Sequence, residues 1–250
     1  MKDIKVDKNP IAMLFNKVKN ESCVNFNFEE NGMYAFLNCF SYLYYRKNVE
    51  LYKNYKTIYC DGILMQKLVS LAGIKTQRIS FDMTSLAPVV FGYAEKNNKT
   101  IAIVGSDRNS NEIAVRTILE RYPKLNIIEK RNGYFKNADE ENIYLDMLRQ
   151  IDPDILIVGM GTPAQDIFLS KIYLREWDGV AFTCGGFLHQ TAKNGNKYYP
   201  DFFNKYNLRW LYRIIDEPKL LYRYLFDYPK SILLFSYDLM CFKIMAKNYN

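Results

Sequence analysis

The sequence has little of what marks metal and hydrolytic sites. Its single histidine, His189, has no second histidine with which to share a metal ion. No serine or cysteine elbow motif accompanies it, which argues against a hydrolytic triad. The five cysteines are scattered and never form a C-x-x-C pair. Neither a disulfide framework nor a zinc site is indicated, and a reducing cytosol fits this pattern.

Long hydrophobic runs are also missing. The charged segment 1–10 leads into no long apolar stretch, which excludes an ordinary signal peptide. The longest apolar segment, 232–245, is too short to cross a bilayer and is interrupted by Asp238 and Lys243. We therefore expect a protein that is not integral to the membrane but could lie on its surface.

Two nucleotide fingerprints are absent as well. Neither G-x-G-x-x-G nor G-x-x-x-x-G-K-[ST] occurs, which disfavours NAD enzymes and P-loop kinases. The 250 residues are 49% hydrophobic and can bury a full core. A formal charge of +7 indicates an anionic partner, which could be nucleic acid, a phosphorylated ligand or a lipid surface.

Short apolar runs alternate with amphipathic stretches from about residue 22 to 186, a pattern typical of a parallel sheet covered on both faces. The predicted strands are 23–28, 57–60, 100–105, 126–129, 155–159 and 180–184. Two sets of apolar residues fall at helical spacing and are predicted to be core faces of helices: Met33, Phe36, Leu37 and Phe40, and then Val115, Ile118, Leu119 and Tyr122. We predict a Rossmann-like α/β domain over residues 1–200, with a mostly parallel sheet and helices on both faces.

The composition changes after residue 200. No further strand is convincing, and aromatic and basic residues mix at helical spacing. We predict a helical appendage over residues 201–250. It could lie against anionic lipid and cover the ligand site, or it could be a packed helix with a solvated charged face.

The predicted strand ends are where a ligand would bind, because the carboxyl ends of parallel strands meet at one edge. The ends with glycine or short polar residues are Asp61-Gly62, Gly105-Ser106-Asp107, 159–163 and Cys184-Gly185-Gly186. Such glycines let a backbone approach a ligand or make a tight turn, and several on one edge favour a ligand. Ser106 or Asp107 could cap a helix near Ser110.

Asp61 is the best candidate for a catalytic base. It follows a buried strand and precedes a helix predicted from about residue 63 to 71. Its carboxylate could accept a proton from a hydroxyl, or it could cap that helix. By contrast, Asp152-Pro153-Asp154 imitates a metal-binding D-x-D motif, but it precedes its strand and is predicted to lie at the opposite edge.

Several segments carry a family resemblance in chain order. They are Val24-Asn25-Phe26-Asn27, Asp61-Gly62, Arg78 with Asp82, 103–105, Tyr122-Pro123, Gly133-Tyr134-Phe135, Gly159-Met160-Gly161-Thr162-Pro163-Ala164-Gln165-Asp166, 208–213, Glu217-Pro218 and Arg223-Tyr224. The ordered set resembles the WecG/TagA/CpsF family of bacterial glycosyltransferases. Asn25 replaces the Thr of its Thr-x-Asn strand end, and Phe187-Leu188-His189 replaces its Gly-Phe-Asp.

The resemblance implies transfer of a sugar from a UDP-sugar to a polyprenyl-diphosphate-linked acceptor, with inversion and without a metal or other cofactor. It implies a peripheral protein on the inner face of the cytoplasmic membrane that serves cell-surface polysaccharide synthesis, with Asp61 as base. The residues expected to contact the donor are Asn27, Arg78, Asp82, Gly105, Ser106, Tyr134, Gly159, Gly161, Gln165, Gly185 and Gly186. Arg213 and Arg223 would reach its diphosphate, and His189 and Gln190 are candidates for reading the substrate.

Two rival functions stay open at the level of sequence. The basic charge and the tyrosines would permit nucleic-acid binding, although no RNA-binding motif is visible. A nucleotide-dependent oxidoreductase is the second rival. The donor sugar, the acceptor glycan and assembly into a homo-oligomer are not determined.

Overall fold

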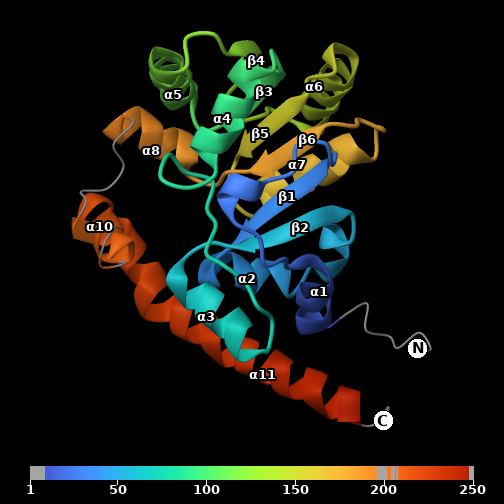
Figure 1. Cartoon of the computed structure of the whole chain (residues 1–250), viewed down its shortest axis with the longest axis vertical. Helices are drawn as coiled ribbons and strands as arrows, with labels where there is room; N and C mark the ends of the chain where they lie inside the picture. Colours follow the sequence, from blue (N-terminus) through green and yellow to red (C-terminus); the bar gives the residue numbers. More distant parts are fainter. Residues whose placement is uncertain (1–8, 196–201, 204–205, 207, 248–250) are drawn as a thin grey trace.

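A six-stranded parallel sheet forms the centre of the molecule (Figure 1). The computed structural model describes residues 9–195, 202–203, 206 and 208–247. The strands are β1 Gly32–Leu37, β2 Tyr55–Cys60, β3 Thr100–Gly105, β4 Asn126–Arg131, β5 Ile155–Gly159 and β6 Val180–Thr183. Their order is β2-β1-β6-β5-β3-β4, and every neighbouring pair is parallel. The predicted Rossmann-like α/β class is confirmed.

Helices cover both faces of this sheet, because the central strands are apolar at nearly every position and must be buried on both sides. In β3, Ile101 and Ile103 point to one face, whereas Ala102 and Val104 point to the other. One face carries α1 Pro10–Lys17, α2 Cys39–Tyr45, α3 Ile63–Leu71, α6 Ala138–Ile151 and α7 Ala164–Tyr173. The other carries α4 Ala87–Lys96, α5 Arg108–Arg121 and α8 Phe187–Asn194.

The first predicted strand was wrong. Residues 23–28 form no strand, since Cys23–Asn25 is a 3-10 helix (η2). The true β1 includes Met33, Phe36 and Leu37, which the sequence assigned to a helix. The cause is that β1 is apolar along its length, so its hydrophobic residues also fit helical spacing. The other helical set was correct, because Val115 and Ile118 are buried on α5, which ends before Pro123.

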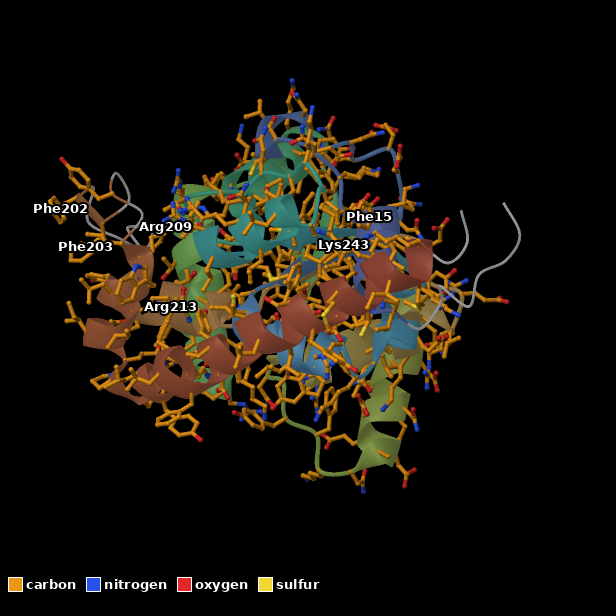
Figure 2. All side chains as sticks on the ribbon, turned by 90° about the horizontal axis from the view of Figure 1, so that it is seen from below. Phe15, Phe202, Phe203, Arg209, Arg213 and Lys243 are labelled. Carbon is orange, nitrogen blue, oxygen red and sulfur yellow. The ribbon has the colours of Figure 1, made fainter. Side chains whose placement is uncertain are left out.

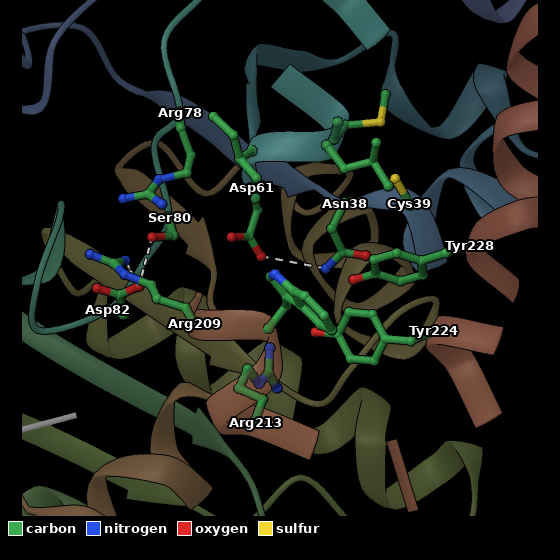
Figure 3. A pocket seen from close by; sticks show the side chains of 15 residues that line it. Asn38, Cys39, Asp61, Arg78, Ser80, Asp82, Arg209, Arg213, Tyr224 and Tyr228 are labelled. Carbon is green, nitrogen blue, oxygen red and sulfur yellow. Dashed lines mark hydrogen bonds and ion pairs between the residues drawn. The ribbon is translucent and has the colours of Figure 1, made fainter. Parts of the chain in front are cut away.

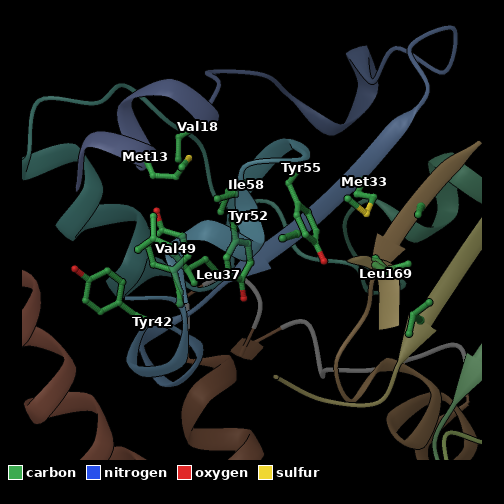
Figure 4. Close-up of a cluster of buried hydrophobic side chains, with 14 of the residues drawn as sticks. Met13, Val18, Met33, Leu37, Tyr42, Val49, Tyr52, Tyr55, Ile58 and Leu169 are labelled. Atoms are coloured by element: carbon green, nitrogen blue, oxygen red, sulfur yellow. The ribbon is translucent and has the colours of Figure 1, made fainter. Parts of the chain in front are cut away.

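Aromatic side chains fill much of the core beneath β1 and β2 (Figure 4). Tyr42 on α2 and Tyr52 on the short helix η3 (Val49–Tyr52) are buried there with Tyr55 of β2. The Tyr52 and Tyr55 ring centroids lie 5.1 Å apart. This cluster supports α2, which begins immediately after the end of β1.

The chain after residue 208 is helical, as predicted. It forms α10 Arg209–Asp216, η4 Pro218–Leu220, η5 Arg223–Asp227 and the long α11 Tyr228–Lys247. Figure 2 shows α11 crossing the underside of the domain, with Lys243 at the end that lies near Phe15. The rings of Phe15 and Phe242 stack with centroids 5.2 Å apart. The proposed division at residue 200 falls among residues outside the described ones.

A buried ion pair holds α11 against α2. Asp238 of α11 is 5% exposed, and it accepts hydrogen bonds from Arg46 Nε and Nη2, both at 2.8 Å. The Tyr42 hydroxyl donates a third bond to Asp238 at 2.8 Å. A buried carboxylate needs such partners, because its desolvation is otherwise uncompensated. The pair therefore fixes where α11 lies.

We predict that Asp238→Asn lowers the free energy of unfolding by about 3 kcal/mol, because it leaves the Arg46 guanidinium without its charged partner. Urea titration followed by circular dichroism measures the change. Glu50→Gln is the matched control, since Glu50 pairs with Lys53 at the surface and its loss should cost less than about 0.5 kcal/mol. Equal effects of the two substitutions would contradict the anchoring role.

Candidate functional site

A crevice opens at the carboxyl ends of β1, β2, β5 and β6. The neighbouring strands β1 and β6 lead into α2 and α8, which cover opposite faces of the sheet. Where adjacent connections diverge in this way, their loops leave a ligand-binding gap beyond the strand ends. The C-terminal segment covers one side of the gap with side chains of α10 and η5.

Asp61 lies at the centre of this crevice (Figure 3). It follows β2, and its backbone N–H continues the ladder by donating to the Leu37 carbonyl at 2.8 Å. Gly62, not Asp61, occupies the N-cap position of α3, with φ of 86° and no capping side chain. The capping alternative for Asp61 is therefore wrong, and its carboxylate faces the crevice.

Asn38 orients that carboxylate from the neighbouring strand. Its side-chain Nδ2 donates to Asp61 Oδ2 at 3.4 Å, while its Oδ1 accepts from the Ser41 backbone N–H at 3.0 Å. Asn38 is thus the N-cap of α2 and a partner of Asp61 at once. The sequence interpretation missed it, because β1 was predicted as helix and its end went unrecognised.

The surroundings of Asp61 act on its pKa in opposite directions. Burial raises the pKa of the Asp61 carboxyl above its ordinary value, and the negative charge of Asp82 acts in the same direction. Arg213 lowers that pKa, as do Asn38 and Arg78 more weakly. A carboxylate with a raised pKa is a stronger proton acceptor, which suits a general base.

On one side of Asp61 the crevice is lined by turn glycines. We call this part the glycine lobe; its distinctive residues are Gly161, Thr162, Gln165, Gly185, Gly186, Gln190 and Arg223. Its volume of about 420 Å³ lies in the range of small-molecule sites, roughly 300–1,000 Å³. Gly161 and Gly185 have positive φ values of 74° and 53°, and a Cβ on either would meet no atom within 4 Å. Their backbones are therefore open to a ligand.

Gln165 braces the glycine lobe. The Gln165 side chain is 4% exposed, and its Oε1 accepts from the Gly185 backbone N–H at 2.9 Å. Its Nε2 donates to Thr162 Oγ1 at 3.4 Å. The side chain thus ties the loop after β5 to the turn after β6.

On the other side of Asp61 lies a second part, the aromatic lobe. Its distinctive residues are Arg78, Arg209, Trp210, Tyr224 and Tyr228, together with the first turn of α3. Both lobes share Asn38, Asp61, Ser80, Asp82 and Arg213. Ser80 donates to Asp82 at 2.6 Å, and Arg209 pairs with Asp82 at 3.5 Å.

Residues 4–243 match the model of the glycosyl transferase WecG/TagA/CpsF family. The chain belongs to this family. It is a glycosyltransferase, and the expected family resemblance is confirmed, whereas the rival interpretations as a nucleic-acid-binding protein or an oxidoreductase lose their basis.

Named relatives of this glycosyltransferase are transferases as well. The UDP-Gal:alpha-D-GlcNAc-diphosphoundecaprenol beta-1,4-galactosyltransferase of Shigella boydii is 36% identical over 227 residues, covering 89% of this chain and 94% of the relative. The N-acetylglucosaminyldiphosphoundecaprenol N-acetyl-beta-D-mannosaminyltransferase of Bacillus spizizenii is 25% identical over 69% of this chain and 65% of its own length. A Staphylococcus aureus enzyme of the same name is 27% identical, over 58% of this chain and 54% of the relative.

The structure brings most of the predicted site residues of this glycosyltransferase to the crevice. Arg78, Asp82, Gly161, Gln165, Gly185, Gly186, Gln190, Arg213 and Arg223 all line it with Asp61. Sequence reasoning missed Asn38, Ser80, Trp210, Tyr224 and Tyr228. Asn38 directly follows β1, so a correct prediction of that strand would have placed it at the same edge of the sheet as Asp61.

Other predicted residues lie elsewhere. Gly105 and Gly159 pack against each other, since a Cβ on Gly105 would stand 2.3 Å from the Gly159 carbonyl oxygen. Ser106 accepts from the Gly133 N–H at 2.8 Å, and Tyr134 lines a separate hollow beside Arg131. The contact of these four residues with a donor stays a prediction.

Two more predicted residues do not line the crevice. Asn27 precedes β1, at the amino edge of the sheet, where its Nδ2 donates to Glu30. His189 is exposed on α8, and its Nδ1 lies 3.5 Å from Ser110 Oγ. Asp154 also lies at the amino edge, where it accepts from the Thr100 N–H at 2.8 Å, as its position before a strand indicated.

Asp166 is a buried carboxyl next to Gln165, in the first turn of α7. It is 2% exposed, and burial raises its pKa to about 6, although hydrogen bonds from Tyr52 and Thr162 oppose the rise. One carboxyl oxygen, Oδ2, has no hydrogen-bond partner among the residues that the structure describes. The native state therefore holds the carboxyl proton more tightly than the unfolded chain does.

We predict that Asp166→Asn stabilises the fold at pH 8. The stability that protonated Asp166 gives is fully present below about pH 4 and is lost as pH rises through about 6, whereas an amide does not ionise. The gain should reach about 2 to 3 kcal/mol at pH 8 and vanish near pH 4, measured by denaturant titration. Asp139→Asn, an exposed acid in the first turn of α6, is the control and should show no such pH dependence.

Proposed function

We propose that this glycosyltransferase moves a sugar from a UDP-sugar to an acceptor linked to polyprenyl diphosphate, with inversion at the anomeric carbon. The observation that carries the proposal is the position of Asp61, which borders both lobes and has Arg213 beside it. A base at the junction of two substrate spaces can accept the proton of a hydroxyl held in one space while the hydroxyl oxygen attacks a carbon held in the other. The three relatives support the substrate classes, because their names specify diphosphoundecaprenol acceptors.

The chemistry is a single displacement. The acceptor hydroxyl gives its proton to the Asp61 carboxylate, and its oxygen forms a bond to the anomeric carbon of the donor sugar. The bond between that carbon and the β-phosphate oxygen breaks, and UDP leaves with the electron pair. Attack opposite to the leaving group inverts the anomeric centre.

Positive charge on the UDP side supports departure of the diphosphate. Arg213 and Arg223 both line the glycine lobe, and the N-terminus of α8 opens onto it at Gly186. Helix N-termini and arginines stabilise phosphate oxygens. We therefore propose that the arginines and backbone N–H groups neutralise the developing charge, without a metal cofactor.

The proposal is tested by screening UDP-sugars in EDTA with an N-acetylglucosaminyl diphosphate that carries a short alkyl tail. UDP-galactose comes first, because the Shigella boydii relative uses it. Transfer that yields a product of inverted configuration supports the proposal. No transfer from any UDP-sugar, or transfer that EDTA abolishes, contradicts the proposed reaction or its metal independence.

We predict that Asp61→Asn lowers kcat about 10² to 10⁴-fold, because an amide cannot accept the hydroxyl proton. UDP affinity, measured by isothermal titration calorimetry, should stay close to that of the natural chain. Asp107→Asn is the matched control, since Asp107 also follows a strand but caps α5, and asparagine caps as well. Full activity of the Asp61 variant would exclude Asp61 as the base.

We propose further that the C-terminal helices lie on the inner face of the cytoplasmic membrane. No helix among the described residues is long and apolar enough to cross a bilayer. However, α11 exposes Leu233, Tyr237, Met240 and Ile244 at spacings of three and four residues, each more than half exposed. We call these four residues the outer stripe of α11. An apolar stripe with nearby lysines fits a lipid interface, and the inner face is where nucleotide-sugars are available.

We predict that a Leu233→Ser and Ile244→Ser double variant loses most of its binding to vesicles that contain phosphatidylglycerol, because the outer stripe loses two of its apolar side chains. Co-sedimentation measures the bound fraction. Ile143→Ser with Leu174→Ser is the control, since both residues are about as exposed but lie far from α11, on α6 and just after α7. Unchanged binding of the α11 variant would rule out the stripe as the contact.

A further inference from the structure

The crevice has one carboxylate and two lobes with different chemistry. Asp61 borders both lobes, so a ligand in either one can reach it. A displacement needs an acceptor hydroxyl within reach of both the base and the anomeric carbon, so the two substrates must meet beside Asp61. If the proposed function holds, each lobe therefore takes one substrate, and their linings decide which.

The glycine lobe suits the donor diphosphate. Open backbone at Gly161 and Gly185 allows close approach of an anion, and the N-terminus of α8 adds N–H donors. Arg223 lines the glycine lobe and not the aromatic lobe. The aromatic lobe has one open glycine turn, Gly62 before α3, whereas the glycine lobe has two, after β5 and after β6.

The aromatic lobe, at about 110 Å³, is smaller than the glycine lobe and adjoins it at Asp61 and Arg213, and its rings suit one face of a sugar. The ring centroids of Tyr224 and Tyr228 lie 4.5 Å apart, and those of Trp210 and Tyr224 lie 6.0 Å apart. Such rings offer a flat apolar surface for the C–H face of a pyranose. Ser80 and Asp82, which line both lobes, lie on the opposite side of Asp61 from Tyr224, as Figure 3 shows.

Two arginines give the aromatic lobe positive charge. Arg78 and Arg209 line the aromatic lobe and not the glycine lobe, and Arg209 is oriented by its ion pair with Asp82. A neutral sugar does not need two guanidinium groups beside it. A sugar that carries its own diphosphate does.

We propose that the aromatic lobe is the acceptor subsite and binds a glycosyl diphosphate. The proposal rests on the proposed function and assigns its second substrate a place. The acceptor sugar stacks on Trp210 and Tyr224 with its reactive hydroxyl toward Asp61, and its diphosphate contacts Arg78 and Arg209. The donor diphosphate occupies the glycine lobe at the same time.

Trp210 allows a binding test that needs no catalysis. The chain has two tryptophans, and the other, Trp177, is buried at the amino edge, where its Nε1 donates to the Pro153 carbonyl. Titration with the alkyl N-acetylglucosaminyl diphosphate should change the tryptophan fluorescence and saturate. Saturating UDP should leave this titration in place, and Trp210→Phe should abolish the signal. Absence of the signal in the natural chain, or displacement of the glycosyl diphosphate by UDP, overturns the proposal.

Kinetics test the stacking directly. Tyr224→Ala should raise the KM for the alkyl acceptor about tenfold, as expected for loss of a stacked ring, and leave the donor KM unchanged. Tyr224→Phe retains the ring and should restore the acceptor KM. Tyr222→Ala is the matched control, because Tyr222 lies on the same segment but is 63% exposed and lines neither lobe.

The outcomes separate the two proposals. If no UDP-sugar is transferred but the fluorescence titration saturates in the presence of UDP, the acceptor subsite stands and the proposed reaction fails. If transfer occurs and Tyr224→Ala raises the donor KM instead, the reaction stands and the assignment of the lobes is wrong.

Discussion

The placement of α2 is the constraint on which the site depends. At its first turn Asn38 caps the helix and bonds to Asp61, and one turn later Tyr42 bonds to Asp238 of α11. Arg46, just past the end of the helix, completes the ion pair. One short helix therefore connects the candidate base to the C-terminal helix. A shift of α2 would alter both the orientation of Asp61 and the wall that faces it.

This arrangement explains how a sequence-distant segment becomes part of the site. Arg213 and Tyr224 follow the last strand by 30 or more residues, yet they face Asp61 across the crevice. Tyr228 begins α11, which the Asp238 ion pair holds in place. The two sides of α11 therefore differ. Its inner side is anchored on α2, while its outer stripe is exposed.

The buried carboxylates of this fold differ in the partners that offset their desolvation. Asp238 has charged and hydroxyl partners within 2.8 Å, which offset its desolvation. Asp166 has no cationic partner among the groups that shift its pKa, so burial dominates and its pKa rises to about 6. At Asp61, burial raises the pKa as well, although Arg213 and Asn38 oppose the rise. The partners of a buried carboxylate, and not its depth alone, decide how far its desolvation is offset.

The sequence by itself determined the α/β class, five of the six strands, the helical C-terminus and the family. It failed at β1, because an apolar strand buried on both faces has no alternation to mark it. Only the tertiary structure decided which strand ends meet. The ends of β1, β2, β5 and β6 share the crevice, whereas Tyr134, beyond β4, lines a separate hollow. The physical reason is that strand order depends on helix packing between distant residues, which no local pattern records.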